Sequence, residues 1–388
     1  MCVAALALLP PLSAPHFRLA ASHHVSRRHH RHHRHHHHRR HHHHRAATVA
    51  LVPAATTPAP VSVSVSCSLY AATGGSDSNP GTAAAPLASP QTLLNALAPG
   101  QVGCVRSGTY HVPELRATHS GSAGAPITLQ SYPGERATII TDSDIYVPDT
   151  IAYNSFVGLD LTNNLSSGSV AQSMIQDFGE NTVWQGDDIS GNDHSTCMEL
   201  GSVGWGTAHN TLISGNKIHD CGSTADGNQD HGIYAAISRG ATITGNVFWA
   251  AAAYAIQLYP DADNTTVSHN VFDGSGYGAV IYASDEYSSG LTSDDNSVTQ
   301  NVIADGTRYG LDYWWGPAGQ GTGNSADSNC FYNNAISDLQ GSMSGITVTN
   351  TVHANPQFVN PAAHDYRLQP GSPCLPIVGY DTAARSGS

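Results

Sequence analysis

Apolar residues recur in one short pattern along most of this 388-residue chain. An apolar residue is followed by two variable positions, an Asn, another variable position and a second apolar residue. The fourth positions of seven copies are residues 159, 187, 216, 246, 270, 301 and 329, so the steps are 28, 29, 30, 24, 31 and 28 residues. Asn occupies this position in the last five copies. Self-similarity at such a period indicates a repeat architecture.

A second set of short segments recurs in phase with the first and alternates with period two. These segments are residues 198–200, 233–235, 256–258, 280–282 and 311–313. They are rich in β-branched and aromatic residues and are bounded by turn residues, which is typical of β-strands. No helical periodicity longer than two turns follows residue 100. One short helix is expected over residues 89–98, with Ser89 as its N-cap and Pro90 at its first position.

Three short strands in each repeat predict an all-β fold, a single-stranded right-handed parallel β-helix. Each coil would add one strand to each of three parallel sheets, giving about seven to ten coils, and the short helix would cap the N-terminal end. The Asn column is expected to line one corner as a turn ladder, because Asn tolerates left-handed conformations and its amide can bond to the coils above and below. A leucine ladder is absent, and propeller blades need longer repeats.

The first part of the chain lacks this pattern. Residues 23–45 contain 14 His and seven Arg, between short apolar runs at 3–12 and 46–55. Neither run reaches the ~20 residues of a membrane-spanning helix, and either could be the apolar region of a signal peptide. We predict that residues 1–66 are a signal, a low-complexity tract and a linker, disordered and without catalytic function. Residues 67–380 would form the β-helix domain, and 381–388 a disordered tail.

Charge is distributed unevenly. The net charge is −13, but the segment from residue 61 onward holds seven Arg, one Lys and all 29 acidic residues, which gives 8 − 29 = −21. Such a domain repels a phosphate backbone, so nucleic acid is not an expected partner. An acidic surface with few ammonium groups is compatible with bound cations or with a carbohydrate ligand. We expect a secreted monomer.

Six of the seven cysteines lie in the predicted domain, and none forms a CxxC pair that would indicate a zinc ribbon. Well-spaced cysteines of even number indicate an oxidising compartment and disulfides. Of the 15 ways to pair six cysteines, we expect the pairing of sequence neighbours. These pairs are Cys67 with Cys104, Cys197 with Cys221, and Cys330 with Cys374.

The beginning of the domain carries a family resemblance. Residues 70–82 read YAATGGSDSNPGT, and the expected helix, the segment VRSGTY at 105–110 and the segment APITL at 125–129 follow. This order resembles the opening of secreted right-handed β-helix proteins similar to polysaccharide lyases, of the family 9 pectate lyase and chondroitinase B types. The resemblance extends over residues 68–375 and implies the fold more strongly than the reaction.

A lyase of this kind removes the proton next to a uronate carboxylate. It needs a base, and often Ca²⁺ held by Asp residues to neutralise the carboxylate. Outward positions in adjacent coils lie about 4.8 Å apart. We therefore expect Asp188, Lys217, His219 and Asp220 to cluster, with Lys217, the single lysine, and His219 as candidate bases. The alternative is a surface ion pair that contributes ~0–1 kcal/mol.

The segment 221–232 offers a second set of candidates. Asp226, Asn228 and Asp230 alternate as the first ligands of a calcium loop do, although the Gly and the final Glu of that motif are missing. Asp230 and His231 are candidates for a base or a substrate contact. A polar turn, with His231 packed beside Tyr254 of the next coil, is the alternative.

Candidate substrate-binding residues lie on another predicted sheet. Exposed aromatic rings stack on sugars, carboxylates bind sugar hydroxyls, and arginines can meet a uronate. These candidates are Tyr234, Gln257, Tyr259, Arg239, Arg308, Asp312 and Trp314. Trp314 could instead cover a loop edge.

The resulting prediction is a secreted polysaccharide lyase that cleaves a uronate-containing polymer by β-elimination, with Ca²⁺ as its expected cofactor. A glycoside hydrolase, which needs two facing carboxylates, and a uronate epimerase are alternatives on the same scaffold. A non-catalytic carbohydrate-binding or surface protein is the alternative outside enzymes. The scarcity of cations is the main argument against the lyase.

Overall fold

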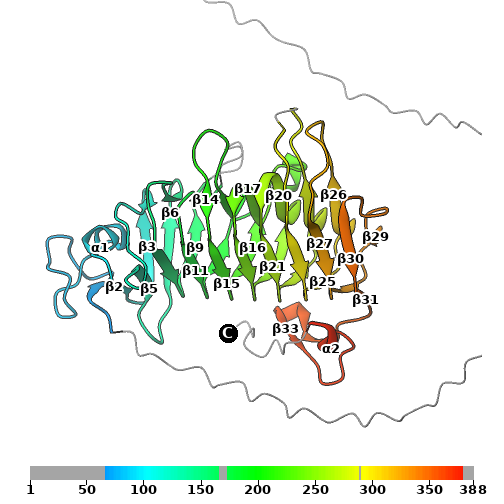
Figure 1. Cartoon of the computed structure of the whole chain (residues 1–388). Helices are drawn as coiled ribbons and strands as arrows, with labels where there is room; N and C mark the ends of the chain where they lie inside the picture. The colour runs from blue at the N-terminus through cyan, green and yellow to red at the C-terminus, as the bar shows by residue number, and fades with distance from the viewer. Residues whose placement is uncertain (1–65, 166–172, 288–289, 379–388) are drawn as a thin grey trace, which may run out of the picture. The chain divides into compact units, whose positions relative to one another are not determined.

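The computed structural model describes residues 66–165, 173–287 and 290–378. They form an all-β, right-handed parallel solenoid of about eight turns, which confirms the predicted fold class (Figure 1). The predicted signal, the His- and Arg-rich tract and the C-terminal tail lie outside the described residues. Within the described ranges, no helix is long and apolar enough to cross a bilayer.

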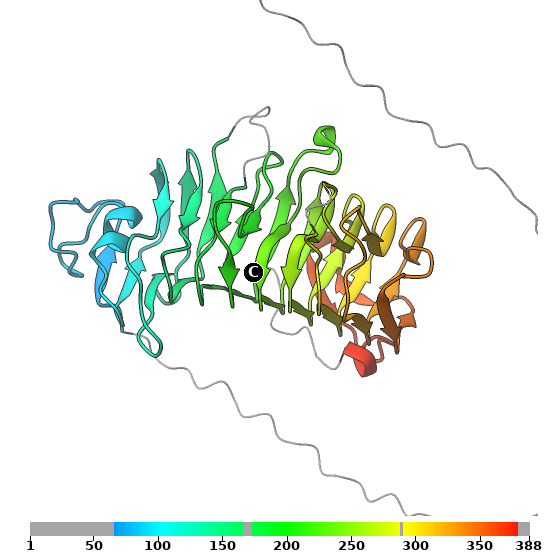
Figure 2. The ribbon, with the colours of Figure 1, turned by 45° about the horizontal axis from the view of Figure 1, so that its top comes forward.

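Three parallel sheets run along the solenoid, and each coil contributes one strand to each of them (Figure 2). In spatial order, sheet 1 consists of β1 (Leu69–Ala71), β2 (Val102–Val105), β5 (Ile127–Ser131), β8 (Asn154–Val157), β11 (Val183–Gln185), β15 (Leu212–Ser214), β18 (Thr242–Thr244), β21 (Thr266–Ser268), β24 (Ser297–Thr299), β27 (Asn324–Asp327) and β30 (Ile346–Thr349). Sheet 2 consists of β3 (Gly108–Val112), β6 (Ala137–Thr141), β9 (Asp160–Asn163), β12 (Asp188–Ser190), β16 (Lys217–Cys221), β19 (Val247–Ala251), β22 (Val271–Asp273), β25 (Val302–Ala304), β28 (Cys330–Tyr332) and β31 (Val352–His353). Sheet 3 consists of β4 (Leu115–Arg116), β7 (Ile145–Val147), β10 (Ile175–Asp177), β13 (Met198–Leu200), β17 (Ile233–Arg239), β20 (Tyr254–Asp263), β23 (Gly278–Ala283), β26 (Tyr309–Trp314) and β29 (Ser337–Leu339), with β14 (Ala208–His209) beside β17.

The core is built from columns of identical or similar side chains in successive coils. In sheet 1, Trp184 pairs with Phe156 on one side and Ile213 on the other, and the two aromatic rings stack at 4.2 Å. In sheet 2, Phe248 pairs with Phe272, and their rings stack at 4.9 Å. These side chains are fully buried. The strand register in the structure is therefore the one that the sequence repeat predicts.

Asparagine side chains form a ladder at the corner between sheets 1 and 2, as predicted. The Oδ1 atom of Asn246 accepts hydrogen bonds from the backbone N–H of Asn216 at 2.9 Å and from its Nδ2 at 3.0 Å. The same two bonds join Asn246 to Asn270, Asn270 to Asn301, and Asn301 to Asn329. All these side chains are buried. Each coil is thus joined to the next by polar groups that have no water to bond to.

The left-handed backbone conformation at this corner belongs to the residue before the Asn. The prediction that the Asn itself adopts it is wrong. Gly215 has φ +67°, and His269 and Gln300 each have φ +55°. The ladder asparagines are not among the residues with positive φ. The chain turns one residue early, so that the Asn side chain points into the corner.

The N-terminal helix forms where it is expected but ends two residues sooner. Helix α1 spans Pro90–Ala96, and the Ser89 hydroxyl accepts a hydrogen bond from the backbone N–H of Gln91 at 3.1 Å. Leu93 and Leu94 are buried against the first coil. Two single turns of 3₁₀ helix, η1 (Thr224–Asp226) and η2 (Pro361–Ala363), lie in connections.

The C-terminal segment covers the outer face of sheet 2. Strands β32 (Phe358–Asn360) and β33 (Asp365–Leu368) form an antiparallel hairpin, which helix α2 (Leu375–Val378) follows (Figure 1). This segment buries Val247, Val271 and Val302, which point outward from the solenoid. In earlier coils the same column holds Asp188 and Lys217, whose side chains are 29% and 33% exposed.

All three predicted disulfides are present. They join Cys67 to Cys104, Cys197 to Cys221, and Cys330 to Cys374. The last of these ties the C-terminal segment to β28. The disulfides support an oxidising environment for the folded protein.

We expect the Asn270→Ala substitution to lower the free energy of unfolding by roughly 2–5 kcal/mol, because it removes the acceptor of two buried donors of Asn246. Urea unfolding followed by circular dichroism measures the change. The control is Asn360→Ala, at an exposed Asn whose side chain makes no capping bond, and it should stay within about 0.5 kcal/mol. Equal losses in the two variants would contradict the ladder's role.

Candidate functional site

A cavity of about 770 Å³ lies on the outer face of sheet 3, and we call it the sheet 3 cleft. Its floor is a column of outward residues that successive strands hold in register. Glu199 of β13 pairs with Tyr234 of β17, and Tyr234 pairs with Gln257 of β20. The lining residues are Ser173, Thr196, Glu199, Val203, Asn228, Gln229, His231, Tyr234, Gln257, Tyr259, Pro260, Ile281, Ala283, Asp285, Glu286, Tyr287, Leu291 and Trp314.

The sheet 3 cleft combines carboxylates with aromatic rings. Glu199, Asp285 and Glu286 supply the carboxylates, and none of the described lining residues is Lys or Arg. Four Tyr and Trp rings line the cleft, those of Tyr234, Tyr259, Tyr287 and Trp314. The Tyr287 side chain is 79% exposed and that of Trp314 is 44% exposed, although both are large and apolar. Exposed aromatic residues beside acidic groups are suited to bind sugars, since each ring offers an apolar face.

Glu199 lies on the floor of the cleft and is half-buried. Its Oε2 atom accepts a hydrogen bond from the Ser173 hydroxyl at 3.1 Å. Burial raises the pKa of Glu199, and the hydrogen bonds from Ser202 and Ser173 oppose this shift without cancelling it. Among the described lining residues no Lys or Arg compensates the carboxylate, so its protonated form is favoured relative to an exposed Glu. A carboxylic acid of this kind can donate a proton.

His231 lies at the base of the cleft and is buried, so its surroundings favour the neutral ring. Burial lowers its pKa to about 3, against a hydrogen bond with the Gln257 side chain that favours the charged form. The Nδ1 atom accepts a hydrogen bond from the backbone N–H of Tyr254 at 3.4 Å, and the two rings stack at 6.2 Å. His231 therefore packs beside Tyr254, as the alternative prediction had it, and its ring is hydrogen-bonded to the Gln257 side chain.

Two further candidates, Asp312 and Arg239, are held by internal partners. Asp312 is buried, and its Oδ2 atom accepts a hydrogen bond from the Tyr254 hydroxyl at 2.5 Å. Arg239 pairs with Asp261 at 2.6 Å and with Asp263 at 3.4 Å. Their side chains are not among those that line the cleft.

Arg308 is likewise outside the cleft lining. Its guanidinium lies 4.9 Å from the centre of the Tyr277 ring and 5.6 Å from that of Tyr309. Of the predicted substrate-binding residues, Tyr234, Gln257, Tyr259 and Trp314 line the cleft. Sequence reasoning did not single out Ser173, Thr196 or Val203, because no motif marks them.

The predicted calcium ligands are not brought together by the described contacts. Asp230 is buried, and its Oδ2 atom accepts a hydrogen bond from the backbone N–H of Ser223 at 2.9 Å, while Asn228 is exposed and lines the cleft. The Asp226 side chain is outside what the structure describes. Among the described residues, no group of three or more His, Cys, Asp or Glu is arranged to hold a metal ion. Calcium stays a prediction.

Lys217 and His219 do form the expected cluster, but on sheet 2. The His219 Nε2 atom lies 2.7 Å from Asp188, its Nδ1 atom lies 2.8 Å from Asp220, and the Lys217 Nζ atom lies 3.7 Å from Asp188. The Trp249 ring stacks on the His219 ring at 4.2 Å. The candidate catalytic residues Lys217 and His219 thus belong to β16 of sheet 2, whereas Asp230 and His231 precede β17 of sheet 3.

Comparisons with known proteins agree with this fold. A family model described as a right handed beta helix region matches residues 155–320. The pectate lyase Pel9A is similar with a TM-score of 0.50 and 16% identity, over 80% of this chain and 91% of that chain. A GH136 lacto-N-biosidase from Eubacterium ramulus gives a TM-score of 0.48 and 13% identity, over 73% of this chain and 67% of its own. The uncharacterized protein YwoF of Bacillus subtilis (strain 168) is 37% identical over 75 residues, which is 19% of this chain and 16% of YwoF. The predicted resemblance to β-helix polysaccharide lyases is therefore confirmed for the fold.

The sheet 2 cluster predicts a pH-dependent contribution to stability. Burial disfavours the charged form of His219, but its hydrogen bonds and charge interactions with Asp188 and Asp220 outweigh burial and raise its pKa. A His whose pKa is raised in the folded state stabilises the fold at pH values below the ordinary His pKa of ~6.5. This stabilisation is lost as the pH rises through the raised pKa.

We therefore expect His219→Gln to lower the melting temperature by roughly 1–3 °C near pH 5 and by less at pH 9. Differential scanning calorimetry across this range measures the effect. His111→Gln, at an exposed His of β3, is the control and should show no such trend. A loss that stays constant from pH 5 to pH 9 would show that the charged cluster does not stabilise the fold.

Proposed function

We propose that this protein is a carbohydrate-active enzyme that hydrolyses glycosidic bonds of a neutral polysaccharide in the sheet 3 cleft. One observation carries the proposal: the cleft joins three carboxylates and four aromatic rings, without Lys or Arg among its described lining residues. Aromatic faces bind sugar rings, and carboxylates accept hydrogen bonds from sugar hydroxyls. A polyanionic chain would be repelled there unless a cation accompanied it.

The residues of the cleft match the two roles that hydrolysis requires. Most glycosidases use one carboxylic acid to protonate the leaving oxygen and a second carboxylate as base or nucleophile. Glu199, whose pKa burial raises, is suited to the acid role. Asp285 and Glu286, on the connection after β23, line the same cleft and are the candidates for the second role. Tyr234 and Tyr259, whose rings stack at 6.4 Å, would orient the sugar.

Export from the cell is part of this proposal. Polysaccharides are met mainly outside the cell, and the three disulfides of the domain are typical of oxidising compartments. The basic and apolar N-terminal sequence supports the same interpretation.

β-Elimination on a uronate polymer is the second candidate, and the sheet 2 cluster favours it. Lys217 and His219 place an ammonium group and an imidazole beside Asp188, and the Lys217 side chain is 33% exposed. In this case Lys217 would act as the base. Ca²⁺ would be needed to neutralise the uronate carboxylate, because the domain is strongly acidic.

One assay separates the two candidates. The protein is incubated with neutral polymers and with pectate, alginate and glucuronan, with and without Ca²⁺. New reducing ends without ultraviolet absorbance indicate hydrolysis, whereas absorbance of an unsaturated uronate indicates β-elimination. Lys217→Ala should abolish only the second reaction. Release of unsaturated products alone would overturn the hydrolase proposal, and no cleavage of any polymer would overturn both.

We expect Glu199→Gln to lower kcat on the neutral polymer by about 10²- to 10⁴-fold, because a Gln cannot donate the proton. The wild-type rate should fall as the pH rises through the raised pKa of Glu199, and the variant should lose this limb of the pH profile. Glu180→Gln, at an exposed Glu outside the cleft lining, is the matched control and should keep the wild-type rate. An unchanged rate in Glu199→Gln would exclude Glu199 as the acid.

A further inference from the structure

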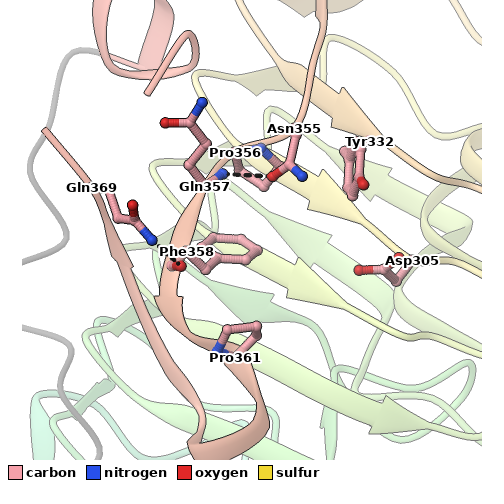
Figure 3. A pocket seen from close by; sticks show the side chains of 8 residues that line it. All are labelled: Asp305, Tyr332, Asn355, Pro356, Gln357, Phe358, Pro361 and Gln369. Atoms are coloured by element: carbon pink, nitrogen blue, oxygen red, sulfur yellow. Dashed lines mark hydrogen bonds between the residues drawn. The ribbon is translucent and has the colours of Figure 1, made fainter. Parts of the chain in front are cut away.

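A second cavity, of about 360 Å³, lies where the C-terminal hairpin meets the solenoid (Figure 3). Tyr332 ends β28 and Asp305 follows β25, so both belong to the sheet 2 side of the solenoid. Asn355, Gln357 and Phe358 come from the segment that leads into the hairpin. The cavity exists only because the hairpin folds back onto sheet 2, and we call it the hairpin cavity.

Two aromatic rings shape the hairpin cavity. Tyr332 and Phe358 are both half-buried, and both line the cavity. The Phe358 ring packs edge-on against buried Tyr366, with centres 5.1 Å apart and an interplanar angle of 83°, which fixes its orientation. In Figure 3, Phe358 lies opposite Asp305 and Tyr332 across the cavity. Rings held in this way are suited to stack on a sugar.

Polar groups around the rings can bind hydroxyls. The Asp305 carboxylate is held by the Asn333 Nδ2 atom at 2.5 Å, and the Asn355 Oδ1 atom accepts a hydrogen bond from the backbone N–H of Gln357 at 2.8 Å. The Asn355 amide NH₂ and the Tyr332 hydroxyl have no hydrogen-bond partner among the described residues. A carboxylate acceptor, an amide donor and a phenol therefore meet at one place.

We propose that the hairpin cavity binds a neutral saccharide unit. The described lining residues include no Lys or Arg, and the Asp305 carboxylate would repel an anionic sugar. The volume is near the lower end of the ~300–1,000 Å³ that is usual for small-molecule sites, which suits a short stretch of a glycan. Because the hairpin cavity is on sheet 2, it would hold a polymer at a place separate from the sheet 3 cleft. This binding does not depend on the reaction proposed for that cleft.

The test is affinity electrophoresis of the full chain in gels that contain xylan, galactomannan or mixed-linkage β-glucan. The wild type should be retarded by at least one of these polymers. Tyr332→Ala should raise its dissociation constant from that polymer by about three- to tenfold, through loss of one stacking face. Asp305→Asn keeps an acceptor for Asn333 and should weaken binding without unfolding. Tyr132→Ala, at a half-buried Tyr that lines neither cavity, is the matched control and should bind as the wild type does.

Each outcome decides the proposal. Selective weakening in the Tyr332 and Asp305 variants, with unchanged hydrolysis of a short soluble oligosaccharide, would support it. No retardation of the wild type by any of the three polymers would overturn it, as would equal retardation of the wild type and the Tyr332 variant. Failure of the hydrolase proposal would appear as absent cleavage by the wild type, and that result leaves the electrophoresis unaffected.

Discussion

The hydrogen bonds between successive coils are the interaction on which the rest of the structure depends. Parallel strands pair along each of the three sheets, and the asparagine ladder joins the coils again at the corner between sheets 1 and 2. Each coil can bury its apolar side chains only when it has a neighbour, so a single coil has no stable core of its own. The ends of the stack need separate protection, and helix α1 buries Leu93 and Leu94 against the first coil.

Because the inward positions and the corner are fixed by stacking, the outward positions are free to differ along one column. The column that follows the ladder in sheet 2 holds Asp188 and Lys217 in early coils and Val271 and Val302 in later ones. The change coincides with the edge of the C-terminal segment, which removes the valines from water. In sheet 3 the corresponding outward residues Glu199, Tyr234 and Gln257 form the floor of a cleft instead.

The few cations of the domain are distributed so that the sheet 3 cleft stays acidic. Arg239 is paired with Asp261 and Asp263, Arg308 lies over tyrosine rings, and Lys217 is beside Asp188 on another sheet. Burial in the cleft therefore raises the pKa of Glu199, and no Lys or Arg among the described lining residues opposes this shift. A cleft of this character is suited to uncharged sugars, and the same holds for the hairpin cavity with its single carboxylate, Asp305.

The sequence by itself determined the coil, its register and the neighbours within each column, because every repeat presents the same few side chains to the core. It placed Asp188, Lys217 and His219 together, and Tyr234 and Gln257 together on another sheet, since residues in one column differ by whole repeats. It could not show which of these outward residues line one cleft, or that Asp312 is buried and hydrogen-bonded to the Tyr254 hydroxyl. It also gave no sign that residues 358–378 return to sheet 2 and create a cavity beside Tyr332. Such contacts depend on how irregular connections fold over the solenoid, and these connections carry no period that a sequence pattern can reveal.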